Sequence, residues 1–353
     1  MALQPIPGFQ HFTTQHCVTG SLCHIYAFYG YPVSEEMLLG LGSGVGFVYW
    51  HTRGALPFLG GRANIERPGE EGLEKTAGRR TGVRVDSFRT GSAAKAEKTL
   101  LELLTGGQPV MLLVDMGYLP YFDFGEEEFH FGYHAVVACG YDTETKEILL
   151  ADRDESLHAV SLEALRHARG STYPPFPPRH AWYRFDFSQA RPAGIPAGIP
   201  AAGGEIREAI SGCVKGMLEP PITNLGVKGI RKAAQRIRKW PEAMEAEELR
   251  AACINACIMI DARSGTGGGL FRYMYGRFLE EAAGLTGEPG LSEAGQAFRT
   301  AGDCWQQVAA LFEQAYAAAR PAEVLETICT ILPELAGQEE RAWSRLGELM
   351  REY

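Results

Sequence analysis

The sequence has 353 residues, with 34 Lys or Arg against 43 Asp or Glu, so its formal net charge of −9 excludes a generally basic nucleic-acid-binding surface. A content of 45% hydrophobic and 22% charged residues excludes a disordered chain, and no apolar run approaches the ~20 residues of a membrane span. Because the first ten residues lack a secretory pattern and the eight Cys lack disulfide-like spacing, we expect a cytoplasmic protein that binds neither nucleic acid nor membrane.

The first predicted element is a helix that opens near Cys17 and ends near Gly30. Polar residues precede it, and its apolar positions recur at helical spacing. A cysteine at a helix N-terminus feels the positive end of the helix dipole, which lowers its pKa and favours the thiolate. Cys17 is therefore a candidate nucleophile. The alternative is a small buried residue, which is the interpretation we give Cys23 on another face of the helix.

Short apolar runs bounded by Gly, Pro or polar residues predict strands at 110–114, 135–139, 148–151 and 182–187. His134 stands at the entry of the second run, and Asp152 follows the third. The turn at 142–146 makes these two runs a β-hairpin, in which the two ends lie side by side. The carboxylate can then orient the imidazole, and the imidazole can take the proton of a thiol. Alone, His134 could equally be a core histidine and Asp152 a turn residue.

The composition changes near residue 190. Before it, strand and helix patterns alternate; residues 191–203 form a Pro/Gly/Ala linker; after it, Ala, Leu, Glu, Arg and Gln dominate, as in packed helices. We therefore predict an α+β domain over 1–190 and an all-helical domain over 204–353.

An amphipathic helix with basic residues and no acidic one is predicted between residues 227 and 240. Its basic face is usually a solvated surface. In a net-acidic protein it could also dock an acidic acyl carrier protein or the phosphate-bearing arm of one. The residues assigned to that role are Lys228, Arg231, Lys232 and Arg236.

Several motifs resemble the family of butirosin biosynthesis protein H N-terminal domains. In the first half they are His16-Cys17, Gly30, Ser34-Glu35-Glu36, Gly40-Leu41-Gly42-Ser43-Gly44, Asp115 to Tyr121, and His134 to Asp142. The helical half resembles, more loosely, the uncharacterised domain often fused behind it, through Gly268 to Arg272 and Phe278-Leu279.

This resemblance implies a papain-like cysteine fold and, from the named member, an acyltransferase that moves an aminoacyl group from a carrier-protein thioester to an amine. Carried over residue by residue, Cys17 is the nucleophile, His134 the base and Asp152 the orienting carboxylate of a catalytic triad. A Gln a few residues before the Cys usually stabilises the oxyanion. Gln10 and Gln15 both qualify, and spacing favours Gln10.

Two further places are candidate substrate-binding sites. Asp115, Tyr118 and Tyr121, at the end of the strand 110–114, could hold an amine, although loops commonly carry such polar residues. Arg272 follows a Gly-rich segment that could bind an anion, and a simple interhelical loop is the alternative. We expect no metal and no cofactor, because neither the His130/His134 spacing nor that of Cys253/Cys257 completes a ligand set.

The function predicted from the sequence is a thiol-dependent transfer of an acyl or aminoacyl group from a thioester to a small-molecule amine, through an acyl-cysteine, in natural-product biosynthesis. The alternatives are a cysteine peptidase or amidase with water as acceptor, and a non-catalytic papain-like binding protein.

Overall fold

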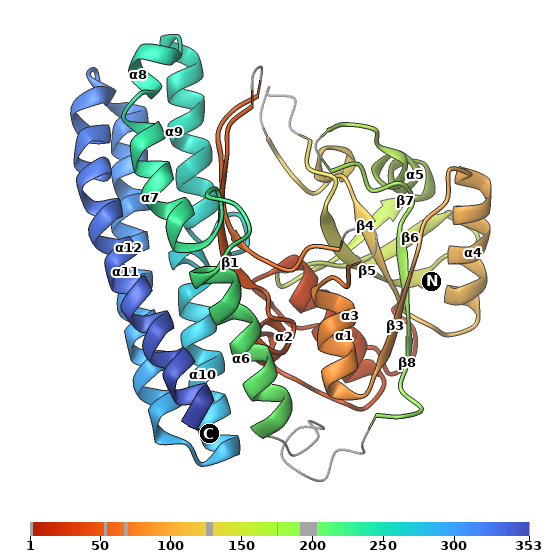
Figure 1. Cartoon of the computed structure of the whole chain (residues 1–353). Helices are drawn as coiled ribbons and strands as arrows, with labels where there is room; N and C mark the ends of the chain where they lie inside the picture. The colour runs from red at the N-terminus through yellow and green to blue at the C-terminus, as the bar shows by residue number, and fades with distance from the viewer. Residues whose placement is uncertain are drawn as a thin grey trace. The chain divides into compact units, whose positions relative to one another are not determined.

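The computed structural model describes residues 3–52, 55–66, 70–124, 130–174, 176–190 and 203–352. Contacts divide the chain into two compact units, each built from two separate stretches (Figure 1). Unit 1 comprises Met1–Leu38 and Thr81–Ile199, and unit 2 comprises Leu39–Arg80 and Pro200–Tyr353. The predicted boundary near residue 190 therefore needs a correction, because residues 39–80 belong with the helices of unit 2. Residues 191–202 of the predicted linker lie outside the described residues, and Gly203 begins a helix.

Unit 1 is built on a six-stranded sheet in the order β3-β8-β4-β5-β6-β7, with every neighbouring pair antiparallel. Its elements are α1 (Cys17–Phe28), β3 (Arg84–Phe88), α4 (Ala93–Thr105), β4 (Val110–Val114), η1 (Met116–Tyr118), β5 (His134–Tyr141), β6 (Glu147–Ala151), β7 (Leu157–Ser161), α5 (Leu162–Gly170) and β8 (Trp182–Asp186). The four predicted strands are confirmed as β4, β5, β6 and β8, and the predicted first helix is confirmed as α1.

The central strands of this sheet are covered on both faces. All five residues of β4 and the first seven of β5 are buried. Figure 1 shows α1 and α4 on opposite sides of the sheet, and both helices contact β4 and β5. Because α1 is surrounded by protein, nine of its twelve residues are buried. The helix that begins at Cys17 is thus held by packing along most of its length.

Unit 2 contains most of the helices and a two-stranded antiparallel sheet. Its elements are β1 (Val45–Trp50), β2 (Phe58–Arg62), α3 (Leu73–Thr81, whose last residue belongs to unit 1), α6 (Gly203–Leu218), α7 (Gly226–Ile237), α8 (Trp240–Ala243), α9 (Ala246–Ile260), η2 (Gly269–Phe271), α10 (Arg272–Thr286), α11 (Pro289–Ala317) and α12 (Pro321–Glu352). The short helix α2 (Glu35–Leu41) begins in unit 1 and ends in unit 2.

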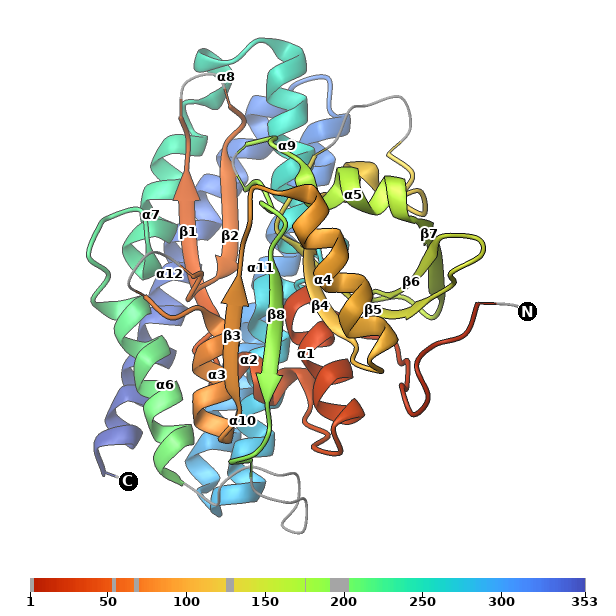
Figure 2. The ribbon, with the colours of Figure 1, turned by 90° about the vertical axis from the view of Figure 1, so that its right-hand side faces the viewer.

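The two longest helices, α11 and α12, pack against each other and bury Phe298, Trp305 and Trp343. The hairpin β1-β2, whose strands run side by side in Figure 2, packs against this helical framework: β1 contacts α6 and α7, and β2 contacts α9. Described residues after 203 are helical, as predicted, but unit 2 is not all-helical because it includes this hairpin. Within the described part of the chain, no helix combines the length and the apolar character needed to cross a bilayer.

Candidate active site

Cys17 is the first residue of α1, where the backbone N–H groups have no helical acceptors. His16 caps this end: its Nδ1 accepts a hydrogen bond from the N–H of Thr19 at 3.4 Å and lies 3.1 Å from the Thr19 hydroxyl. The helix dipole and the exposed N–H groups favour negative charge at this position. Cys17 as a whole residue is partly exposed, although the surrounding protein desolvates its thiol.

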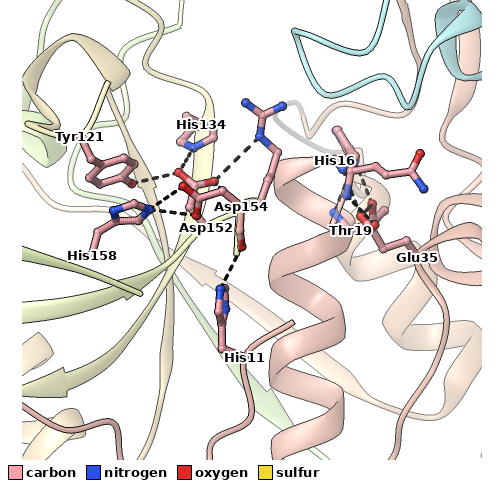
Figure 3. Close-up of polar contacts among 11 residues, drawn as sticks. His11, His16, Thr19, Glu35, Tyr121, His134, Asp152, Asp154 and His158 are labelled. Atoms are coloured by element: carbon pink, nitrogen blue, oxygen red, sulfur yellow. Dashed lines mark hydrogen bonds and ion pairs between the residues drawn. The ribbon is translucent and has the colours of Figure 1, made fainter. Parts of the chain in front are cut away.

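A buried carboxylate, Glu35, holds the backbone around Cys17 (Figure 3). Its Oε2 accepts a hydrogen bond from the N–H of Gln15 at 2.7 Å, and its Oε1 accepts one from the N–H of His16 and one from the hydroxyl of Thr19, each at 3.1 Å. Burial raises the pKa of Glu35, while the two backbone hydrogen bonds oppose that shift. This contact was missed by the sequence analysis, where Glu35 served only as part of a resemblance motif. Three convergent donors fix how the chain enters α1.

His134 begins β5, and Asp152 directly follows β6, its neighbour in the sheet. The Nε2 of His134 lies 2.7 Å from Oδ2 of Asp152, and both side chains are buried (Figure 3). The hairpin thus brings the two ends together as the sequence predicts. Because Nε2 faces the carboxylate, Nδ1 is the ring nitrogen left for Cys17. The ring of Phe122 stands edge-on to the imidazole at 5.5 Å and restrains its orientation.

The segment before α1 is joined to the loop after Asp152. The N–H of Thr14 donates to the carbonyl of Arg153 at 2.8 Å, and Nε2 of His11 lies 2.9 Å from the carbonyl oxygen of Asp154. These bonds set the start of α1 beside the hairpin. There the side chains of His134 and Cys17 lie close enough for each to shift the pKa of the other.

The electrostatics of the three groups favour a thiolate–imidazolium pair. For Cys17, desolvation by the surrounding protein would raise the pKa, but the hydrogen bond and charge of His134, with smaller contributions from Arg153 and the N–H of Ala135, lower it. For His134, burial would lower the pKa, but the charge and hydrogen bond of Asp152, helped by Cys17, raise it to about 9. The pKa of Asp152 falls to about 2, because His134 outweighs its desolvation.

Six other cysteines show the opposite behaviour. Burial raises their pKa values, to about 12 for Cys139 and Cys253, and to about 11 for Cys213, Cys257 and Cys329; that of Cys304 is also raised. Among the cysteines with a resolved shift, Cys17 alone has a lowered pKa.

Tyr121 lies at this site, but not as a free substrate-binding phenol. Its hydroxyl donates to Oδ2 of Asp152 at 2.9 Å, and its ring stacks on His158 at 3.8 Å (Figure 3). His158 in turn lies 2.8 Å from a carboxylate oxygen of Asp154. Burial and the charge of Asp152 raise the pKa of Tyr121 well above its usual value. No local pattern predicts this partner, because Tyr121 and Asp152 are brought together only by the fold.

No hydrogen bond or ring contact among the described residues joins Asp115 or Tyr118 to Cys17, His134 or Asp152, so the structure does not group them with Tyr121 and their part in substrate binding stays a prediction. The Asp115 side chain is fully buried and accepts hydrogen bonds from the N–H groups of Gly117 and Phe131. It also lies 2.9 Å from Nδ1 of His130. The ring of Tyr118 packs near that of His130, with centroids 5.1 Å apart. Asp115 therefore organises its own loop.

Arg272 also needs a correction, because it is buried in the core of unit 2 with no exposed surface. Its Nε and Nη2 donate to the two carboxylate oxygens of Glu339 at 2.8 and 2.7 Å. Its Nη1 donates to the carbonyl oxygens of Gly46 and Leu270 at 2.8 and 2.9 Å. A guanidinium so enclosed and so engaged holds the core, and a substrate cannot reach it.

The two candidate oxyanion glutamines are both exposed. The N–H of Gln15 is taken by Glu35, and within the described residues no contact joins Gln10 to Cys17. The described residues also contain no group of three or more His, Cys, Asp or Glu arranged to hold a metal ion.

Fold and site together define a two-unit protein whose first unit carries a cysteine–histidine–aspartate site on a helix and an antiparallel sheet. Residues 16–153 match the family described as butirosin biosynthesis protein H, N-terminal, and residues 163–346 match the family described as domain of unknown function (DUF4872). The second match spans more than half of the 353 residues, so the chain belongs to the DUF4872 family, with the butirosin protein H-type domain before it. The resemblance seen in the sequence is thereby confirmed. No curated protein matches the chain.

Proposed function

We propose that unit 1 is a thiol-dependent acyltransferase of papain-like fold. The observation that carries this proposal is the buried, hydrogen-bonded pair of His134 and Asp152, whose imidazole lowers the pKa of Cys17. The nucleophile opens a helix that packs against an antiparallel sheet, and the imidazole comes from a strand of that sheet. The matched family description, a butirosin biosynthesis protein, supports a role in natural-product biosynthesis.

The reaction proceeds in two half-reactions. The Cys17 thiolate attacks the carbonyl carbon of a thioester, and the C–S bond of the donor breaks as the new C–S bond to Cys17 forms. The imidazolium of His134 gives its proton to the departing thiolate. In the second half-reaction, an amine attacks the acyl-Cys17 carbonyl and His134 takes the proton of the amine, so that an amide is released and the Cys17 thiolate is restored. Asp152 holds the imidazole in position and stabilises its charged form.

Negative charge that develops on the carbonyl oxygen needs donors near Cys17. The N–H groups of Cys17 and Val18, at the start of α1, have no hydrogen-bond acceptor among the described residues. Such helix-terminal N–H groups suit an oxyanion. We therefore propose the N–H groups of Cys17 and Val18 as the main donors to the oxyanion. Gln10, whose exposed side chain makes no described contact with Cys17, remains a proposal for the substrate-bound state.

The test is intact-mass spectrometry of the full chain after incubation with aminoacyl N-acetylcysteamine thioesters. We expect an adduct of one acyl group on Cys17, lost on addition of a small primary amine with formation of the amide. The Cys17→Ala variant is the matched control and should carry no adduct. Release of the acyl group as free acid alone, even with excess amine, would show the hydrolase. No adduct and no turnover with a series of acyl groups would contradict the proposal.

Delivery of the thioester by an acyl carrier protein stays a proposal. Its assigned residues, Lys228, Arg231, Lys232 and Arg236, lie on α7 of unit 2. Transfer from a carrier-bound thioester and from the small thioester would be compared directly: a carrier that docks on α7 should give a higher kcat/KM, and this gain should disappear in the Lys228→Glu variant.

A further inference from the structure

Unit 2 carries a basic concavity of about 550 Å³. It is lined by Thr223, Lys228, Arg231, Lys232, Gln235, Arg236 and Lys239. Five of these seven side chains are cationic and none is acidic, in a chain whose formal net charge is −9. Five of the 34 Lys and Arg residues of the chain therefore gather at this one hollow without an acidic residue among its lining.

The helix α7 arranges most of this lining in two adjacent rows. Lys228, Lys232 and Arg236 follow one another at four-residue spacing; Arg231 and Gln235 form the second row, and Lys239 lies two residues beyond the end of the helix. Residues four apart lie one above the other on a helix, so the first row extends over roughly 12 Å. The opposite face of α7 is apolar and buried. Packing therefore accounts for the apolar face but not for the basic rows.

The cations of this concavity are incompletely neutralised. Arg231 pairs with Glu340, with Nη2 and Oε2 2.6 Å apart. Lys232 donates to two neutral oxygens, those of Thr223 and Asn224. The described residues provide no hydrogen bond or ion pair to the side chains of Lys228, Arg236 and Lys239, all of which are exposed. Four positive charges thus face one hollow without a carboxylate partner.

We propose that this concavity binds a small molecule that carries two or more phosphate groups. Guanidinium and ammonium groups side by side suit phosphate oxygens, and a row of about 12 Å is longer than a single phosphate requires. The volume is within the range of small-ligand sites. No aromatic side chain lines the hollow, so recognition rests on the phosphates rather than on a stacked base. Phosphate binding here does not require the reaction proposed at Cys17, although the same residues of α7 are those assigned to an acyl carrier protein.

The test is isothermal titration calorimetry of the full chain with inorganic tripolyphosphate, pyrophosphate and orthophosphate. We expect saturable binding of one tripolyphosphate, weaker binding of pyrophosphate, and at least tenfold weaker binding of orthophosphate. The Lys228→Glu/Arg236→Glu variant should lose at least tenfold in affinity for tripolyphosphate. The matched control is Arg207→Glu/Lys215→Glu, which makes the same charge change on exposed residues of α6 in the same unit.

A milder variant, Lys228→Met, removes one cation without introducing an acid and guards against misfolding of the double variant. It should weaken binding by a smaller factor while the urea midpoint stays that of the wild type. Equal losses in the control and test variants would show diffuse attraction and overturn the site, as would the absence of saturable binding. Binding of an acidic carrier protein without binding of any free phosphate would likewise overturn it. Acyl transfer at Cys17 is measured separately, so failure of one proposal leaves the other intact.

Discussion

Each unit contains a buried pair of one basic side chain and one carboxylate, and the two pairs have different surroundings. In unit 2, Arg272 and Glu339 have no exposed side-chain surface, and the network closes on itself. In unit 1, His134 and Asp152 are also buried, but the imidazole lowers the pKa of Cys17, a residue that is partly exposed. The Arg272–Glu339 pair holds a core, whereas under the proposed function the His134–Asp152 pair activates Cys17. On this account, the neighbouring thiol, rather than the presence of buried charge, distinguishes the two pairs.

The largest effect on activity is expected at Cys17. Replacing Cys17 with Ala should reduce acyl transfer by about 10⁴-fold or more, because the covalent intermediate cannot form. Stability should change little, since the residue is partly exposed and loses only one sulfur atom. The kinetics of acyl transfer test the predicted loss of activity, and urea unfolding tests the predicted stability. Cys304→Ala, at another partly exposed cysteine but with a raised pKa, is the control and should leave activity unchanged.

At the Arg272–Glu339 pair, a substitution should instead reduce the stability of the protein. Arg272→Met leaves Glu339 buried without its cation and should cost about 3–5 kcal/mol in the free energy of unfolding. The Arg272→Met/Glu339→Leu variant should recover part of this loss. As the control, Arg231→Met breaks an exposed pair and should cost about 1 kcal/mol or less. An Arg272→Met protein as stable as the wild type in urea would show that the pair is not what holds this core.

The third effect is at Asp152, which links the buried and the reactive parts of unit 1. Asp152→Asn should lower kcat/KM by about 10²- to 10⁴-fold, because the imidazole loses its orientation and the partner that stabilises its charge. The pKa of His134 should fall from about 9 as the carboxylate is removed. Titration of the His134 ring by NMR measures this shift. An unchanged pKa would mean that Asp152 does not act on the imidazole.

The same pair predicts how stability depends on pH. The pKa of His134 is raised from 6.5 to about 9, so its contribution is complete below pH 6.5 and is lost as the pH rises through 9. The pKa of Asp152 is lowered from 3.8 to about 2, so its contribution is present above pH 3.8 and is lost as the pH falls through 2. Urea unfolding of the wild type should show both losses, and Asp152→Asn should show neither.

The smallest expected effect is at Tyr121. Tyr121→Phe keeps the ring that stacks on His158 and removes one hydrogen bond to Asp152, worth about 1 kcal/mol, so kcat/KM should fall roughly fivefold. If Tyr121 instead binds the amine, KM for the amine would rise while the rate of Cys17 acylation stays unchanged. Measuring the two half-reactions separately distinguishes these results.

Local patterns were enough to predict the parts of the site that local structure creates. The helix that opens at Cys17 follows from periodicity and a glycine stop, and the meeting of His134 with Asp152 follows from one hairpin. Each of these inferences spans only neighbouring elements. The family resemblance then implied the roles of the three residues as nucleophile, base and orienting carboxylate.

The contacts that the sequence did not predict are long-range. Glu35, the first residue of α2, accepts a hydrogen bond from His16, which lies 19 residues earlier in the chain. Thr14 donates its N–H to the carbonyl of Arg153, which is also distant in the sequence. Arg272 follows a Gly-rich segment that suggested an anion site, but its partner Glu339 lies 67 residues further on. The hairpin of residues 45–62 joins unit 2 through helices that begin after residue 200. No local pattern encodes such pairings.

The central claim, that His134 holds Cys17 as a thiolate before substrate arrives, is tested most directly by the pH dependence of Cys17 alkylation. The rate of iodoacetamide labelling at Cys17, followed by peptide mass spectrometry, should show an apparent pKa below the usual thiol value of ~8.5. Cys17 should also react before Cys139 and Cys253, and His134→Asn should return the apparent pKa to ~8.5 or above. A wild-type Cys17 that titrates near ~8.5 and labels no faster than Cys139 would contradict the account and favour a non-catalytic binding role.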